Sequence, residues 1–301
     1  MTELETTRIA LATGVTLKVA QAGPRDAPAI IFLHGFPESH RTWRHVAPAL
    51  ADRYRVIVPD QRGFGGSDKP EGIEQYRAQE CIADLFALAD AYGIGRFNLV
   101  GHDWGGAIAW GAALTRPDRL DRLVIVNAPH PYIFQRSLIE DAAQRAASQY
   151  ITAFRNPAME RGIEAMGMAT FFAKSFGGHT DLALIPEEER QAYLDDWSQP
   201  GAMTAMLNWY RASPLTIPAI GENVPATRRD PYPILTIPTL VLWGMKDKAL
   251  LPIQLEGLDT MVESLSVKRI EDAGHFVPWE RPEPVIDAIG AFMETPPAPS
   301  P

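Results

Sequence analysis

Short apolar runs bounded by turn-forming residues recur along the chain. They cover residues 29–33, 56–58, 98–101, 123–127, 239–243 and 267–270. Such continuous runs, separated by stretches of helical periodicity, are typical of parallel strands that are buried on both faces. Two alternating segments at 9–12 and 16–20 come first and indicate an opening hairpin. The pattern predicts an α/β fold with a mostly parallel, twisted sheet flanked by helices.

The strand pattern stops in the middle of the chain. Helical stretches take its place at residues 144–154, 159–176, 187–197 and 202–212. A helical insertion in an alternating α/β core is typical of a cap. We therefore predict a core formed by residues 1–129 and 237–294, an inserted helical cap formed by 130–236, and a disordered Pro-rich tail at 295–301.

The composition is that of an ordinary globular protein. Of 301 residues, 46% are hydrophobic and 22% are charged, so the chain can bury a sizeable core. The formal net charge of −9 argues against a nucleic-acid partner, which requires a basic patch. The N-terminus does not have the pattern of a signal peptide, and no run approaches the ~20 apolar residues of a membrane span. We expect a cytoplasmic monomer or homodimer.

No metal or organic cofactor is expected. The sequence has no cluster with the spacing of metal ligands, and the glycine-rich segment 63–66 lacks the context of a dinucleotide-binding loop. The single cysteine, Cys81, excludes an intrachain disulfide and is expected to be a small buried side chain. His40, His45 and His179 are expected on the surface.

The segment Gly101-His102-Asp103-Trp104-Gly105 follows a predicted buried strand and precedes a helical pattern. This is the order of a nucleophile elbow, in which a tight turn directs the central side chain into the active site. The central residue is Asp103 where many enzymes of this type have serine. A carboxylate suits displacement at a saturated carbon and gives an alkyl ester on the enzyme, which water then hydrolyses. The alternative role for Asp103 is a helix N-cap.

Two residues that follow the last two predicted strands complete a catalytic set. His275 follows 267–270 and is placed to deprotonate water, and Asp247 follows 239–243 and is placed to orient the imidazole. The chain order Asp103, Asp247, His275 is the nucleophile–acid–base order of the α/β-hydrolase fold. The alternative role for Asp247 is a solvated turn residue.

The segment His34-Gly35-Phe36-Pro37 follows the first apolar run and predicts an oxyanion hole. The backbone N–H groups of Phe36 and Trp104 are expected to point at the developing charge. Pro37 has no N–H group, and the bond before it is a candidate for the cis form. We expect His34 to be structural rather than a catalytic base. His34, Pro37 and Trp104 are expected to lie against the substrate.

Four blocks of the predicted core resemble the soluble epoxide hydrolases. They are HGFPES at 34–39, DQRGFGGSDKP at 60–70, GHDWGG at 101–106 and EDAGHF at 271–276. Together they resemble the branch of the α/β-hydrolases that uses an aspartate nucleophile, and they imply that role for Asp103. The same branch contains haloalkane and haloacetate dehalogenases, so the core leaves the reaction open.

The predicted cap carries the part of the resemblance that separates these reactions. Epoxide hydrolases of this family hold two tyrosines over the nucleophile, and the two hydroxyls stabilise the epoxide oxygen as the ring opens. The segment LNWYR at 207–211 is similar to the family's N-W-Y-R motif and implies that Tyr210 is one of the two. Tyr150 precedes FRNP at 154–157 and implies the other. A phenol stays protonated near neutral pH and can donate to an alkoxide. The alternative for both is ordinary packing.

Two other functions stay open on the sequence. A dehalogenase would use the same three catalytic residues and bind halide through Trp or Asn N–H groups, or through an Arg after the nucleophile, where this chain has Trp104. Many haloalkane dehalogenases carry their acid after the strand that here ends in Asn127, and an amide cannot act as that carboxylate. The third function is that of a non-catalytic receptor, against which the complete set of Asp103, Asp247 and His275 argues.

The expected ligands are a small apolar epoxide and water. The pocket is expected to be lined by cap residues such as Met166, Phe171, Phe172, Trp197 and Met206.

Overall fold

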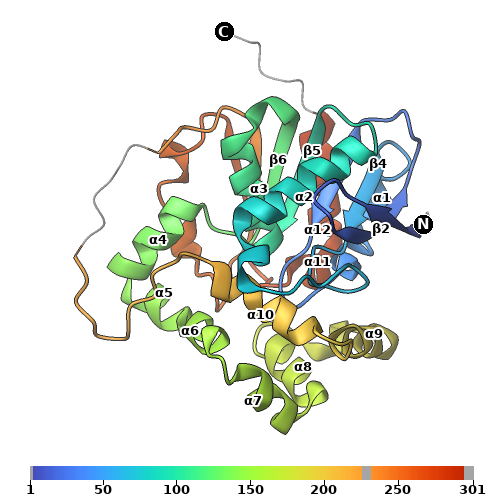
Figure 1. Cartoon of the computed structure of the whole chain (residues 1–301). Coiled ribbons are helices and arrows are strands. Elements are labelled where there is room, and N and C mark those ends of the chain that lie inside the picture. The colour runs from blue at the N-terminus through green and yellow to red at the C-terminus, as the bar shows by residue number, and fades with distance from the viewer. Residues whose placement is uncertain (1–2, 226–231, 295–301) are drawn as a thin grey trace.

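The protein is described by a computed structural model that covers residues 3–225 and 232–294. It is built around an eight-stranded sheet with the order β1-β2-β4-β3-β5-β6-β7-β8 (Figure 1). The strands are β1 (Glu5–Ala10), β2 (Thr16–Ala22), β3 (Ala29–Leu33), β4 (Arg55–Pro59), β5 (Phe97–His102), β6 (Leu120–Val126), β7 (Thr239–Gly244) and β8 (Leu265–Ile270). The first hairpin is antiparallel, β2 pairs antiparallel with β4, and the remaining pairs are parallel. Every predicted strand is therefore confirmed, with its ends moved by a few residues.

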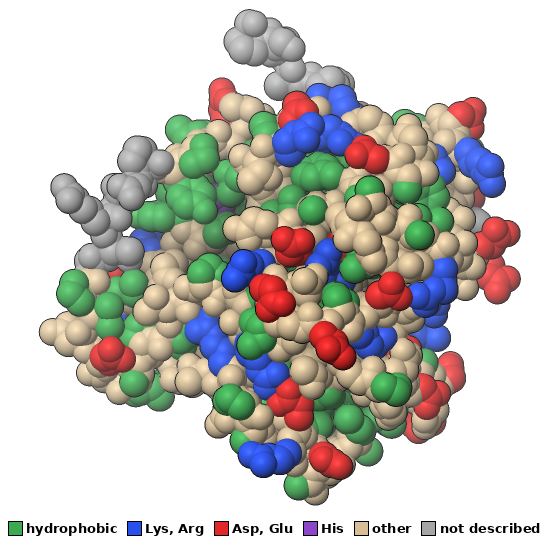
Figure 2. Space-filling view, viewed as in Figure 1, with side chains coloured by type: hydrophobic (Ala, Val, Ile, Leu, Met, Phe, Trp, Pro, Cys, Tyr) green, Lys and Arg blue, Asp and Glu red, His purple; other side chains and the backbone are tan. Residues whose placement is uncertain are grey.

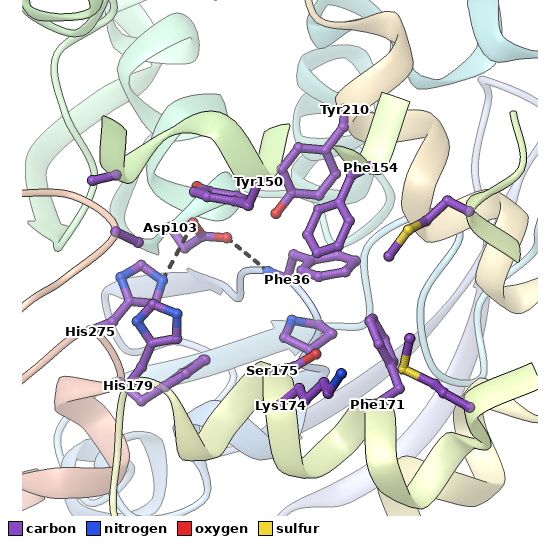
Figure 3. Close-up of a pocket in the computed structure, with 16 residues that line it drawn as sticks. Phe36, Asp103, Tyr150, Phe154, Phe171, Lys174, Ser175, His179, Tyr210 and His275 are labelled. Carbon is purple, nitrogen blue, oxygen red and sulfur yellow. Dashed lines mark hydrogen bonds and ion pairs between the residues drawn. The ribbon is translucent and has the colours of Figure 1, made fainter. Parts of the chain in front are cut away.

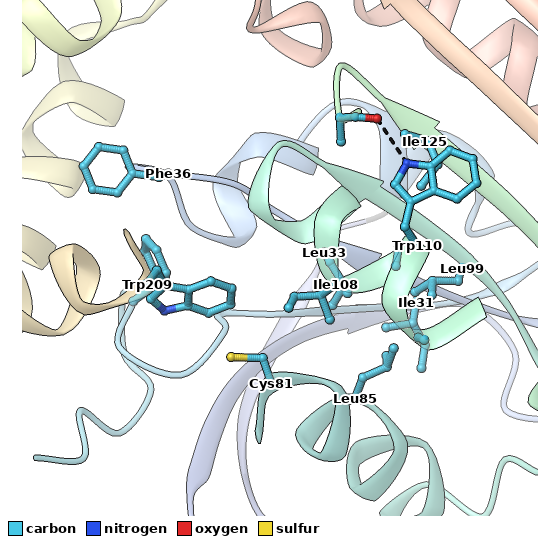
Figure 4. Close-up of a cluster of buried hydrophobic side chains, with 14 of the residues drawn as sticks. Ile31, Leu33, Phe36, Cys81, Leu85, Leu99, Ile108, Trp110, Ile125 and Trp209 are labelled. Atoms are coloured by element: carbon cyan, nitrogen blue, oxygen red, sulfur yellow. Dashed lines mark hydrogen bonds between the residues drawn. The ribbon is translucent and has the colours of Figure 1, made fainter. Parts of the chain in front are cut away.

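Helices cover both faces of the sheet (Figure 1). They are α1 (Val46–Leu50), α2 (Ala78–Ala91), α3 (Trp104–Thr115), α11 (Val277–Glu280) and α12 (Pro282–Glu294). Short 3-10 turns lie at His40–Trp43, Ile73–Tyr76, Pro117–Arg119, Leu182–Leu184, Pro252–Leu255 and Leu258–Thr260. Because successive side chains of a strand point to opposite faces, β3 contributes to two separate apolar clusters. Ile31 packs with helices α2 and α3 (Figure 4), whereas Ile30 packs with α1 and α12.

A helical insertion separates β6 from β7. It consists of α4 (Pro131–Glu140), α5 (Ala142–Ala147), α6 (Gln149–Arg155), α7 (Met159–Met166), α8 (Met168–Gly177), α9 (Glu187–Trp197) and α10 (Ala202–Ala212). Helices α5 to α10 lie together along one end of the sheet (Figure 1). We call α4 to α10 the cap, and the boundaries at 130 and 236 stay a prediction. The tail at 295–301 lies outside the described residues.

Two long helices predicted for the cap are each interrupted. The helix predicted at 144–154 divides into α5 and α6 at Ser148, and the helix predicted at 159–176 divides into α7 and α8 at Gly167. Gly167 has φ of 84°, a conformation that glycine adopts far more readily than other residues. The interruptions turn the chain, so that successive short helices pack around the same space.

Two indole groups tie the cap to the core. Trp197 of α9 donates to the carbonyl oxygen of Pro37 at 2.9 Å, and Trp209 of α10 donates to that of Arg62 at 3.1 Å. Both donors are buried, and such bonds satisfy backbone carbonyls that the strand ladders leave free. The cap is thereby fixed over the loops that follow β3 and β4.

The described surface carries charges of both signs. Acidic and basic side chains are interspersed over the face shown in Figure 2. Within residues 3–225 and 232–294, no helix is long and apolar enough to cross a membrane.

Candidate active site

Asp103 occupies the sharp turn between β5 and α3. Its backbone has φ of 51° and ψ of −120°, a strained conformation for a residue other than glycine. The turn packs closely against the loop after β3, because a Cβ atom on Gly105 would collide with the carbonyl groups of Leu33 and His34. The expected nucleophile elbow has this geometry, and the Asp103 carboxylate points into a cavity between core and cap (Figure 3).

His275 lies between two carboxylates. Its Nδ1 is 2.7 Å from Asp247 Oδ2, and its Nε2 is 3.6 Å from Asp103 Oδ2. Since an ionised carboxylate can only accept, Nδ1 donates to Asp247, and in the neutral ring Nε2 carries the lone pair. The lone pair then faces the Asp103 carboxylate, where a proton acceptor is needed.

Asp247 is held by four hydrogen bonds. Its Oδ1 accepts from the backbone N–H groups of Ala249 and Leu250 at 2.8 and 2.9 Å. Its Oδ2 accepts from His275 and from the side-chain amide of Asn127, the latter at 2.7 Å. Asn127, expected from the sequence only as an amide that cannot replace a carboxylate, therefore orients the carboxylate that follows the next strand.

The charges of these groups set their proton affinities. Burial by itself would raise the pKa of Asp103, but hydrogen bonding and the charge of His275 outweigh it and lower that pKa. The pKa of Asp247 is lowered for the same reason. Burial opposes protonation of His275, yet the two carboxylates raise its pKa well above the ordinary value. The resting state is therefore an imidazolium between two carboxylates.

The loop after β3 contacts the other oxygen of Asp103. The backbone N–H of Phe36 donates to Asp103 Oδ1 at 2.8 Å. Trp104 is the first residue of α3, so its N–H has no partner within the helix. These two N–H groups are the ones expected to form the oxyanion hole. The Phe36–Pro37 peptide bond is cis, as expected, and Pro37 lines the cavity.

Tyr150 of α6 and Tyr210 of α10 lie beside Asp103. Their ring centroids are 6.1 Å apart and the rings are nearly perpendicular. Burial raises the pKa of both phenols, and the negative charge of Asp103 acts in the same direction. Both hydroxyls therefore stay protonated over the range in which proteins work. Their positions match the pair implied by the sequence resemblance.

Two cavities meet at this point, and Asp103, Tyr150 and Tyr210 line both of them. The first, of about 380 Å³, is lined by Phe36, Pro37, Asp103, Ala147, Tyr150, Phe154, Met159, Met166, Phe171, Lys174, Ser175, His179, Tyr210, Ala249, His275 and Phe276. The second, of about 220 Å³, is more apolar and includes Trp104 in its lining. Substrate can therefore extend in two directions from Asp103.

The expected pocket lining is correct in part. Met166 and Phe171 line the first cavity, and Phe171 is labelled in Figure 3. Phe172, Trp197 and Met206 line neither cavity and are buried in the interior instead. All five lie on helices of the cap, and periodicity alone does not show which face of each helix meets the cavity.

The expectation of a surface position is wrong for His40 and His179, whereas His45 keeps partial exposure. His179 lines the first cavity with its ring 5.8 Å from that of His275, His40 pairs with buried Asp60 at 2.7 Å, and His45 is half-buried. Tertiary packing covers His40 and His179 in part, which no local pattern of the sequence shows.

His34 serves the core. It is fully buried, and its Nε2 accepts from the backbone N–H of Gln61 at 3.0 Å. The Gln61 side chain donates in return to the His34 carbonyl oxygen at 2.6 Å. His34 lines neither cavity, so the expectation that it contacts the substrate is wrong. Its contacts are those of a structural residue.

A buried pair behind His275 was missed in the sequence. His102 lies 3.0 Å from Glu38 Oε2 through Nδ1 and donates through Nε2 to the His275 carbonyl oxygen at 2.8 Å. Trp279 donates to the other oxygen of Glu38 at 2.8 Å. The pair fixes the backbone of His275 to the elbow. The sequence did contain a signal for this pair, because His102 lies directly before Asp103 at the end of a predicted buried strand.

Comparisons with known proteins agree with this geometry. The family model for the alpha/beta hydrolase fold matches residues 28–282. The chain is 36% identical to AB hydrolase superfamily protein YfhM of Bacillus subtilis, covering 93% of this chain and 95% of the relative. It is 32% identical to epoxide hydrolase A of Mycobacterium tuberculosis, covering 96% and 97% of the two chains.

A solved structure extends the likeness to the whole fold. It represents novel epoxide hydrolases from metagenomes of hot environments and is 48% identical to this chain, with a TM-score of 0.92. The match covers 98% of this chain and 100% of the other. Fold, sequence and site geometry agree, and the chain belongs to the epoxide hydrolase family of the α/β-hydrolases.

Proposed function

We propose that the protein hydrolyses epoxides to vicinal diols through an ester on Asp103. The observation that carries this proposal is the placement of Tyr150 and Tyr210 beside Asp103, where both phenols line the same cavities as the carboxylate. A neutral phenol suits an oxygen that develops negative charge as a strained ring opens.

In the first step, the Asp103 carboxylate attacks an epoxide carbon. Oδ1 is held by the Phe36 N–H, which leaves Oδ2 to attack. The carbon–oxygen bond of the ring breaks as the ester bond forms, and the electron pair moves to the epoxide oxygen. The hydroxyls of Tyr150 and Tyr210 stabilise this alkoxide, which takes up the proton that His275 gives up once Asp103 has lost its charge.

The ester changes the proton affinity of His275. The negative charge of Asp103 is one of the groups that raise the pKa of His275, and ester formation removes that charge. His275 then loses its proton more readily and becomes a base, still oriented by Asp247. Alkylation thereby prepares the general base for the second step.

In the second step, His275 takes a proton from water, and the hydroxide attacks the carbonyl carbon of the Asp103 ester. Negative charge develops on the oxygen near the N–H groups of Phe36 and Trp104. When the tetrahedral intermediate collapses, the diol oxygen leaves and takes the proton from His275. The second proton of the attacking water passes from the Asp103 carboxyl group to His275, which restores the ionised carboxylate and the imidazolium.

Removal of the tyrosine hydroxyls tests the proposal. We expect Tyr210→Phe to lower the rate of diol formation about 10²-fold, the lower end of the usual range for a proton donor, and the double variant with Tyr150→Phe to be nearly inactive. Tyr193→Phe is the matched control, because Tyr193 is buried in the cap and lines neither cavity. Full activity of the double variant would remove the epoxide assignment, and halide release without diol formation would favour a dehalogenase.

A further inference from the structure

One wall of the first cavity differs in character from the rest. Half of its lining residues are Phe, Tyr or Met, and Phe36, Phe154 and Met159 are among them. Helix α8 and the loop that follows it add Lys174, Ser175 and His179. We call these three residues the polar wall.

The spacing of α8 explains how the polar wall forms. Phe171, Lys174 and Ser175 stand three and four positions apart, so they share one face of the helix. That face lies across the cavity from Tyr150 and Tyr210 (Figure 3). Lys174 is exposed although it lines the cavity, which places it at the rim.

The polar wall has no partner of its own within the described part of the chain. No hydrogen bond or ion pair joins the side chains of Lys174, Ser175 or His179 to any residue in 3–225 and 232–294. The Nδ1 atom of His179 is buried and unpaired. Buried polar groups in folded proteins are normally satisfied, so a group on a cavity wall without a protein partner is available to bind solvent or a ligand.

The chemistry of the polar wall selects an anion. An ammonium group only donates, a hydroxyl can donate, and a neutral imidazole can donate from one nitrogen. Burial, with the charge of His275, lowers the pKa of His179 to about 4, so its ring is neutral near pH 7. Lys174 is the only lysine or arginine among the described residues that line this cavity. A carboxylate accepts from the ammonium and hydroxyl groups of Lys174 and Ser175 and neutralises the lysine, whereas His179 lies beside His275 at the catalytic end of the wall.

We propose that the polar wall binds a carboxylate carried by the substrate, so that the preferred epoxides are epoxy acids whose charged group lies across the cavity from the ring. This inference rests on the proposed epoxide hydrolysis. The negative charge of Asp103 repels a carboxylate, which orients such a substrate with its ring at Asp103 and its charge at Lys174.

Matched substrate pairs test the proposal. We would measure kcat/KM for ω-epoxyalkanoates of increasing chain length and for the corresponding primary amides, which have the same shape and no charge. Hydrogen bonds to charged groups suggest a preference for the acid of about tenfold at the best length. Lys174→Met should bring the acid-to-amide ratio close to one, and Lys174→Arg should restore most of it.

Lys268→Met is the matched control for net charge. Lys268 lies on β8, is exposed and does not line the cavity, so this variant should keep the wild-type ratio. An acid-to-amide ratio of one or less in the wild type overturns the proposal, and so does an unchanged ratio in Lys174→Met. An equal loss in Lys268→Met also overturns it, because the preference would then come from the long-range field of the protein's net charge.

Binding without turnover separates this inference from the proposed reaction. Calorimetric titration with the diol acid and the diol amide should show tighter binding of the acid, lost in Lys174→Met. If no epoxide is hydrolysed but this difference is found, the reaction fails and the polar wall stands. If epoxide amides are hydrolysed and the two diols bind equally, the polar wall fails and the reaction stands.

Discussion

At the scale of single residues, the site depends on how one proton is shared among three groups. His275 is protonated at rest because Asp103 and Asp247 both face it, one at 3.6 Å and the other at 2.7 Å. Of these two charges, only that of Asp103 is removed during the proposed cycle. The same imidazole can therefore be a cation before alkylation and a base after it.

This change predicts that the two steps differ in their response to pH. Alkylation needs ionised Asp103, whose pKa is lowered, so it should persist in acid. Ester hydrolysis needs neutral His275, so its rate should fall about tenfold per pH unit below the pKa that His275 has in the ester. Rapid-quench measurements from about pH 8 to 5 should find the ester accumulating as the pH falls. A constant ester fraction would contradict this account.

At the scale of elements, α6 and α10 must hold Tyr150 and Tyr210 in register. Arg155, at the end of α6, donates to the carbonyl oxygens of Tyr210, Ser213 and Leu215, each at 2.9 Å. A cation at the carboxyl end of a helix is favoured by the helix dipole, and the planar guanidinium can bind several carbonyls at once. Arg155 therefore connects the helix of one tyrosine to the helix of the other.

We expect Arg155→Met to lower the alkylation rate about 10- to 100-fold, because small misplacements of reacting groups have effects of that size. Hydrolysis of the ester should change little, since it does not use the tyrosines. Arg145→Met is the matched control, because Arg145 also donates to three carbonyls, those of Leu138, Ile139 and Glu222, away from the tyrosines. Equal effects of the two variants on the alkylation rate would contradict a positioning role for Arg155 and would indicate that it only stabilises the fold.

Elements were predictable from the sequence where their signal is local. Strands β3 to β7 each contain a short apolar run, and Asp103, Asp247 and His275 follow β5, β7 and β8, so the common edge of the sheet brings them together. The breaks at Ser148 and Gly167 were missed because apolar periodicity continues across them. His179 was misplaced because its position depends on how α8 packs, which no local pattern states.

At the scale of the whole molecule, the site lies where core and cap meet, and His130 stands at the entry to the cap. It precedes α4 and packs edge-on against Trp110 of the core and Tyr232 of the returning chain, with centroids 5.1 Å away in both cases. It is fully buried and neither ring nitrogen has a partner among the described residues. Burial lowers its pKa from 6.5 to about 4.

The junction should therefore weaken in acid. Below pH 6.5 the unfolded chain binds a proton at His130, whereas the folded protein does not bind it until about pH 4. The free energy of unfolding therefore decreases as the pH falls from 6.5 to about 4. The variant His130→Phe keeps the ring contacts and cannot bind the proton. We expect it to recover about 2 kcal/mol of the free energy of unfolding at pH 5, with little pH-dependent effect above pH 7. Urea unfolding at both pH values measures the difference. The same stability difference at pH 5 and pH 8 would contradict it.

The central claim is that the Asp103 carboxylate, rather than water, opens the epoxide. A single turnover with excess enzyme in heavy-oxygen water tests it most directly, with product and enzyme analysed by mass spectrometry. If the ester forms, the first diol carries an unlabelled oxygen taken from Asp103, and the heavy oxygen appears in the Asp103 peptide. Heavy oxygen in the diol from the first turnover, with none in that peptide, would contradict the account.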